Sequence, residues 1–143
     1  MKATIISVSV GILLLACGIQ ASAEEPALGE SEYLQSCASC HGKAGEGDGF
    51  LAPYLKSPPP SLTGLTASNG GVFPMQRVYS VIDGTSTVGV HGGRNMPVWG
   101  GRYSAQAREE LKSFSLGFDE RQEEFVRIRI LALVEYISTL QMK

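Results

Sequence analysis

The stretch Cys37-Ala38-Ser39-Cys40-His41 constrains this chain more than any other feature. Two cysteines separated by two residues, with a histidine directly after the second, have the spacing of a covalent haem-attachment motif. On a helix or tight turn, Cys37 and Cys40 lie about one turn apart and project to the same side. Each sulfur can then form a thioether to one vinyl group of a single porphyrin. His41 approaches from that face, and a neutral imidazole is a good axial ligand for iron.

Three alternatives use the same cysteines. A redox-active dithiol is typical of a βαβ setting, and the sequence shows no alternating strand pattern. A structural zinc ion needs four ligands, and the chain has only three cysteines and two histidines. A disulfide between Cys37 and Cys40 would leave His41 without a role. Attachment of one haem c is therefore the favoured prediction, because it uses all three residues of the motif.

The first 23 residues are predicted to be a secretory signal peptide. Lys2 gives a positive start, an apolar run spans residues 5–16, and Ala21-Ser22-Ala23 provides a small-x-small cleavage site. The run is short for a transmembrane span. Leu14-Leu15-Ala16-Cys17 also resembles a lipoprotein box, which would make a lipidated Cys17 the new N-terminus. Both alternatives place the protein in the periplasm, and attachment to a membrane is expected only if Cys17 is lipidated.

Residues 24–143 are predicted to form one domain. Removing Lys2 with the leader leaves 11 of the 12 basic residues and all 14 acidic ones, a net charge near −3. This balance argues against a nucleic-acid partner, which favours a basic face. A local basic patch that docks a redox partner is compatible with it.

Helix signals recur along this domain, and strand signals are absent. The predicted helices span residues 26–35, 73–82, about 104–114 and about 119–140. Pro74 suits the first position of the second helix, Ser104 is the candidate N-cap of the third, and Asp119 with Gln122 resembles a capping pair for the fourth. Residues 85–101, rich in glycine and proline, are predicted to be a loop. The side chains expected to pack are Val78, Val81, Ile82, Phe125, Ile128, Leu131 or Ala132, Val134, Tyr136 and Ile137.

The chain after residue 24 resembles the class I c-type cytochromes, which are small single-haem electron carriers. The resemblance rests on the haem motif, on Arg94-Asn95-Met96-Pro97-Val98-Trp99-Gly100, and on the apolar segment Ile130–Leu140. It implies an all-α cytochrome c fold, with several helices and long loops around one covalent haem. It also implies that the N-terminal and C-terminal helices cross, with Gly29 and Tyr33 against Tyr136 as the counterparts here.

The segment after the haem motif is rich in glycine and proline. Glycines between residues 42 and 49 match neither nucleotide-binding fingerprint, and they are expected to let the backbone turn tightly beside the haem. Pro58-Pro59-Pro60 is a stiff segment expected to form part of the pocket wall. In the resembled family a backbone carbonyl of this region orients the axial histidine. Pro53 and Pro58 are the candidates for that carbonyl.

Met96 is the predicted second axial ligand of the iron. It lies in a predicted loop, and Pro97 restricts it to extended conformations, which stiffens the ligand segment. A His/Met pair raises the reduction potential of a haem and fills its coordination sphere, which suits a carrier. Met75 and His91 are the alternatives. Methionine in a helix usually fills the core, and a lone loop histidine is more often exposed or one shell away from the iron.

Three further residues are candidates for contacts at the haem edge. Trp99 is expected to pack near this edge, with its indole N–H donating to a propionate. Arg94 and Arg102 flank the Met96 segment and are candidate partners of the propionates, because a buried carboxylate needs a partner. The alternative is that both arginines are ordinary surface charges.

The resemblance implies a periplasmic electron-transfer protein and not an enzyme. Its expected partners are a dehydrogenase, a membrane cytochrome complex or a terminal oxidase. One alternative is the haem subunit of a periplasmic dehydrogenase complex. Another is a haem enzyme or gas sensor with a labile sixth ligand, in which His91 would be the distal acid–base group if Met96 were not bound.

Overall fold

The structure, a computed structural model, describes residues 26–86, 96–113 and 117–142. Its helices are α1 (Leu28–Ser36), α2 (Ala38–His41), α3 (Met75–Asp83), α4 (Trp99–Leu111) and α5 (Phe118–Thr139), with short 3-10 turns η1 (Ala52–Tyr54) and η2 (Ala67–Asn69). These residues contain no strand, so the all-α prediction is confirmed. In the same ranges, no helix combines the length and the apolar character needed to cross a bilayer.

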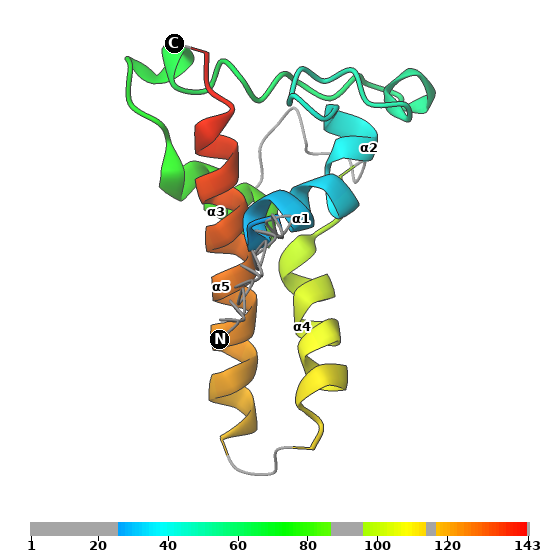
Figure 1. The fold of residues 1–143 in the computed structure, drawn as a ribbon, viewed down its shortest axis with the longest axis vertical. Helices are drawn as coiled ribbons and strands as arrows, with labels where there is room; N and C mark the ends of the chain where they lie inside the picture. Colours follow the sequence, from blue (N-terminus) through cyan, green and yellow to red (C-terminus); the bar gives the residue numbers. More distant parts are fainter. Residues whose placement is uncertain (1–25, 87–95, 114–116, 143) are drawn as a thin grey trace, which may run out of the picture.

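One face of α5 forms the centre of the core. Its buried side chains include Ile130, Leu133, Val134 and Ile137, and this i, i+3, i+4, i+7 spacing produces a single apolar stripe. Helices α1, α3 and α4 all pack against α5, and α4 runs beside α5 as a long hairpin (Figure 1). The expected burial of Val134 and Ile137 is confirmed. Ile128 is 50% exposed, so its predicted packing is wrong because the stripe lies on the neighbouring face. Of the alternatives Leu131 and Ala132, Leu131 is 43% exposed and Ala132 is the half-buried one.

The crossing of α1 over α5 depends on the absence of a side chain at Gly29. A Cβ built there would lie 2.1 Å from the carbonyl oxygen of Ala132, so the two backbones are in direct contact. One turn further along α1, the ring of Tyr33 is buried against Tyr136, with centroids 5.2 Å apart. The crossing implied by the cytochrome resemblance is confirmed, with the three expected residues in place.

Helix α2 has only four residues and is held by the segment that follows it. The amides of Gly47, Gly49 and Leu51 donate to the carbonyls of His41, Cys40 and Ser39, at 2.8, 3.1 and 2.9 Å. These carbonyls would otherwise be the unsatisfied end of a short helix. The return is possible because Gly47 has a φ of +85°, and because a Cβ on Gly49 would lie 2.4 Å from the Ser39 oxygen. The tight turn expected of these glycines is confirmed.

Helix α4 begins earlier than the sequence predicts. Its first residue is Trp99 and its last is Leu111, so Ser104 lies within the helix and is not its N-cap. Trp99, Tyr103 and Ala107 are buried, and their spacing of four residues places them on one face. The helix extends back to Trp99 because this face packs into the core. The predicted loop accordingly ends before Trp99.

Helix α5 also begins differently from the prediction. Gly117 is the residue before the helix, with a φ of +65°, and no side chain caps the first turn. Asp119 lies inside that turn, where a carboxylate is favourable because of the positive end of the helix dipole. The predicted capping pair of Asp119 and Gln122 is therefore wrong.

The prediction for α3 is close, since Pro74 precedes its first residue and Gly84 follows its last.

The residues after α5 hold the segment that follows the proline run. The side chain of Gln141 accepts from the amide of Thr66 at 2.9 Å and donates to the carbonyl of Leu62 at 2.7 Å. The amide of Met142 donates to the carbonyl of Thr63 at 3.0 Å. The C-terminal end of the helical core thus fixes a loop that is far away in the sequence.

We expect Gly29→Ala to destabilise the protein by about 2–4 kcal/mol, because the new methyl group must push apart two packed backbones. Gly101→Ala is the matched control. Gly101 is a helical glycine of α4 with nothing within 4 Å of its Cβ position, so alanine there should stabilise by about 0.5–1 kcal/mol. Urea unfolding of both variants measures the difference. A Gly29→Ala protein as stable as Gly101→Ala would contradict the close crossing.

Candidate functional site

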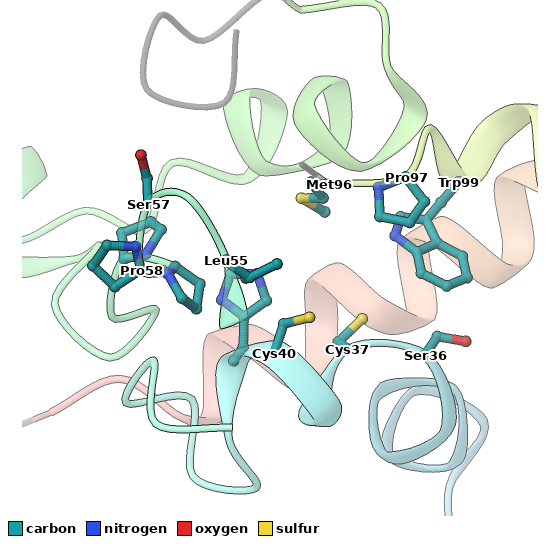
Figure 2. Close-up of a pocket in the computed structure, with 12 residues that line it drawn as sticks. Ser36, Cys37, Cys40, Leu55, Ser57, Pro58, Met96, Pro97 and Trp99 are labelled. Atoms are coloured by element: carbon teal, nitrogen blue, oxygen red, sulfur yellow. The ribbon is translucent and has the colours of Figure 1, made fainter. Parts of the chain in front are cut away.

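The two cysteines of the motif face one cavity from adjacent turns. Cys37 lies at the junction of α1 and α2, and Cys40 lies in α2. Figure 2 shows both sulfurs directed into the space between α2 and the Met96 segment. Both cysteines are free thiols, so the structure does not support a disulfide between them.

His41 and Met96 line the same space as the two cysteines. A smaller cavity of about 60 Å³ lies between α2, the proline run and the Met96 segment, and a larger one of about 270 Å³ lies between α2, residues 61–69 and α3. Cys37, His41, Pro60 and Met96 line both cavities. The two cavities are therefore adjoining parts of one apolar cleft, with the imidazole, one thiol and the Met96 side chain at their shared boundary.

The proline run is a wall of this cleft. Pro58, Pro59 and Pro60 line the smaller cavity, which confirms the position expected for them. In Figure 2, Pro58 and Trp99 stand on opposite sides of the two cysteine sulfurs. Pro53 lies in η1 and lines neither cavity, so Pro58 is the better placed of the two candidate residues for orienting His41.

Tyr33 fixes the motif from the side of the core. Its hydroxyl donates to the carbonyl of Gly42 at 2.7 Å, directly after His41. The amide of Cys37 in turn donates to the carbonyl of Tyr33 at 2.8 Å. Burial, together with the nearby Cys37, raises the pKa of Tyr33 well above its usual value, so this phenol remains a hydrogen-bond donor.

Trp99 forms a wall of the cleft with a layer of side chains behind it. Its ring is buried and lies 6.0 Å from the ring of Tyr103. The guanidinium of Arg102 lies 4.5 Å from the Trp99 ring centroid, the arrangement of a cation–π contact. Arg102 lines neither cavity. The structure thus places Trp99 at the cleft. It places Arg102 over the Trp99 ring and not at the cleft.

A charged cluster joins three helices behind this wall. Tyr103 of α4 donates to Glu32 of α1 at 2.9 Å, and Arg129 of α5 binds the other carboxylate oxygen of Glu32. Arg129 also lies 3.7 Å from Glu110 of α4. The Glu32 and Arg129 side chains are only 12% and 19% exposed. Sequence analysis did not identify this cluster, because its members lie far apart in the chain and belong to no motif.

The electrostatics of the cysteines argue against a redox dithiol. Burial, with the neighbouring Cys40 as a smaller cause, raises the pKa of the Cys37 thiol to about 12. Reactive dithiols instead need a lowered pKa. The described residues also contain no cluster of histidine, cysteine and acidic side chains that could hold a metal ion on its own.

The alternatives to Met96 are less favourably placed or cannot be compared. Met75 is the first residue of α3, is 56% exposed and lines neither cavity. The expectation that it fills the core is therefore wrong, because the first turn of α3 presents it to solvent. His91 and Arg94 lie outside the described residues, as do the predicted leader and Cys17.

The donor set of the cleft matches a covalent haem. Two thiols on one side of the cleft suit thioether formation, the imidazole that follows them suits iron, and a methionine approaches from a separate segment. The surrounding wall is largely apolar, as a porphyrin plate requires. The helical fold and this arrangement define the class of c-type cytochromes.

Comparison with protein families identifies the chain more closely. The family model described as cytochrome c oxidase, cbb3-type, subunit III matches residues 24–114. The protein therefore belongs to this family of cytochrome c domains, which implies a covalent haem c and haem-based electron transfer. Neither the curated proteins nor the solved structures contain a significant match. The whole of α5 lies beyond the matched residues.

We expect Arg129→Leu to lower the free energy of unfolding by up to about 3 kcal/mol. The loss arises because Glu32 keeps its charge in a largely buried position without its cationic partner, and its partial exposure limits the cost. Arg127→Leu, at an exposed position of the same helix, is the control and should change stability by less than about 0.5 kcal/mol. Urea titrations of the two variants give the comparison, and equal midpoints would show that the cluster contributes little.

Proposed function

We propose that this protein is a periplasmic electron carrier with one haem c, bound by thioethers to Cys37 and Cys40 and ligated axially by His41 and Met96. The observation that carries this proposal is the cleft shared by all four side chains. The chemistry supplied by the bound group is reversible one-electron transfer. The polypeptide contributes its attachment, its axial ligands and its surroundings.

The site residues suit a carrier because they are held in fixed positions. His41 is 6% exposed and lies in a helix whose carbonyls are bonded to the returning loop. Met96 is attached to Pro97, which limits its backbone, and α4 begins two residues after that proline. A ligand pair that moves little between oxidation states favours rapid electron transfer, because little of the structure must rearrange.

An enzyme or gas sensor with an open coordination site is the less favoured function. It would require Met96 to lie away from the imidazole, whereas both residues line both cavities. It would also require a distal acid–base side chain. His91, the candidate for this role, lies outside the described residues.

The family description favours one class of partner among those expected. Because the matched family is named after a subunit of a cbb3-type oxidase, we propose that the electron acceptor is a terminal oxidase or a complex associated with one. A dehydrogenase or another membrane cytochrome complex would then be the donor. Copurification with a membrane oxidase would support this assignment.

We expect Met96→Ala to abolish the long-wavelength charge-transfer band of an iron–thioether bond in the ferric protein and to lower the reduction potential, because a soft sulfur ligand favours ferrous iron. The protein should be produced in a bacterium that attaches haem to such motifs, and its absorption spectrum compared with that of wild type. Covalent attachment through Cys37 and Cys40 is checked by mass spectrometry of the denatured protein.

Met75→Ala is the matched control, since it removes a second methionine that lines neither cavity. It should leave the band and the potential unchanged, and His91→Ala should do the same. Retention of the band in Met96→Ala would overturn the assignment of this ligand. A high-spin ferric spectrum in the wild-type protein would favour the enzyme or sensor instead.

Export is proposed to proceed by cleavage after Ala23. The expected result is a periplasmic protein that begins at Glu24, without lipid and unaffected by Cys17→Ser, because the small-x-small site is well placed after the apolar run. Fractionation and mass spectrometry of the intact protein test this expectation. A lipid-modified Cys17 at the N-terminus would contradict it. In that case the wild-type protein would be found in the membrane fraction, and the Cys17→Ser variant would be absent from it.

A further inference from the structure

Arg77 is placed at the cleft in a way that the sequence motifs do not indicate. It belongs to the first turn of α3 and lines the larger cavity together with His41 and Met96. Val81, one turn later on the same helix, lines this cavity too. Among the described residues that line either cavity, Arg77 is the one with a permanent charge.

The neutral polar residues beside Arg77 already have partners. The side-chain amide of Asn69 donates to the carbonyl of Val72 at 2.8 Å, and the hydroxyl of Ser68 donates to the carbonyl of Gly64 at 2.9 Å. Both residues line the larger cavity, as Arg77 does. Arg77 has no ion pair to any described carboxylate. The N–H donors of its guanidinium are therefore available to bind an anion at the larger cavity.

The other arginine near the cleft is engaged elsewhere. Arg102 covers the outer side of the Trp99 ring and lines neither cavity. A guanidinium stacked on an indole remains charged, but its position is set by the ring and not by the cleft. Sequence position favours Arg102, which flanks the Met96 segment, whereas the structure places Arg77 at the cleft.

We propose that Arg77 pairs with a propionate of the haem at the α3 side of the larger cavity. This inference rests on the proposed function. The propionates are the charged groups of haem, and a carboxylate that enters an apolar cleft needs a cation or several donors. A guanidinium meets this need with two parallel N–H···O bonds. Arg77 is itself exposed, so its aliphatic stem can follow the apolar wall while its head meets a half-solvated carboxylate.

A paired Arg77 would affect the redox equilibrium as well as the position of the haem. A fixed positive charge at the cleft favours the reduced form, which carries one positive charge less. Arg77→Gln should lower the equilibrium constant for reduction by about threefold to tenfold, the size expected for one partly screened charge. This corresponds to about 30–60 mV for a one-electron couple.

The test compares Arg77→Gln, Arg77→Lys and Arg102→Gln in the haem-loaded protein. Redox titration gives the potential, and resonance Raman spectroscopy gives the propionate-bending band, which responds to direct hydrogen bonding. Arg77→Gln should shift both. Arg77→Lys should recover most of the potential while leaving the band shifted, because lysine restores the charge without the fork of donors. Arg102→Gln removes the same charge from the Trp99 ring and should leave the band in place.

The outcomes separate this inference from the proposed function. If Arg77→Gln leaves the propionate band unchanged, or lowers the potential no more than Arg102→Gln, Arg77 is a distant surface charge and the pairing is wrong. If the wild-type protein carries no covalent haem, the proposed function itself fails. Circular dichroism of each variant tests whether its helices are intact. If Arg77→Gln does not fold, the Arg77→Lys variant decides, and a propionate band at the wild-type position in that variant would overturn the pairing.

Discussion

The contact on which the rest of the structure depends is the crossing of α1 and α5. With no side chain at Gly29, the α1 backbone rests against the carbonyl of Ala132, and this close approach places Tyr33 in the core beside Tyr136. The hydroxyl of Tyr33 then reaches the carbonyl of Gly42. The haem motif is thus joined at both ends to a residue whose position the crossing determines, and the direction of its sulfurs follows from helix packing.

The opposite wall of the cleft is assembled from segments that have little regular structure of their own. The proline run needs no hydrogen bonds to remain extended, and the segment after it is held by Gln141 and Met142 beyond the end of α5. Met96 reaches the cleft because α4 begins three residues later and buries Trp99. Each wall is therefore anchored to the helical core, so the walls of the cleft are already in position to bind a haem.

Helices α4 and α5 run side by side (Figure 1) and carry a second anchor for the Trp99 wall. Glu32, Tyr103 and Arg129 join α1, α4 and α5 through charge-assisted contacts, which are stronger than neutral hydrogen bonds. Because Tyr103 also packs on Trp99, the cluster supports the wall of the cleft from the rear. The family match ends before α5 begins, so part of what positions this site comes from a helix that the match does not include.

The sequence by itself determined the helical class, the haem motif and the approximate positions of α1, α3 and α5, because these depend on local spacing and turn residues. It also indicated Met96, through a proline that acts on its immediate neighbour. Only the tertiary structure decided where α4 begins, which face of α5 is buried, and which arginine lies at the cleft. The physical reason is that burial is set by residues distant in the chain. Trp99 extends α4 because a core is present to receive it. Arg77 lines the cleft because α3 packs beside the haem motif, whereas Arg102 lies over the indole of Trp99.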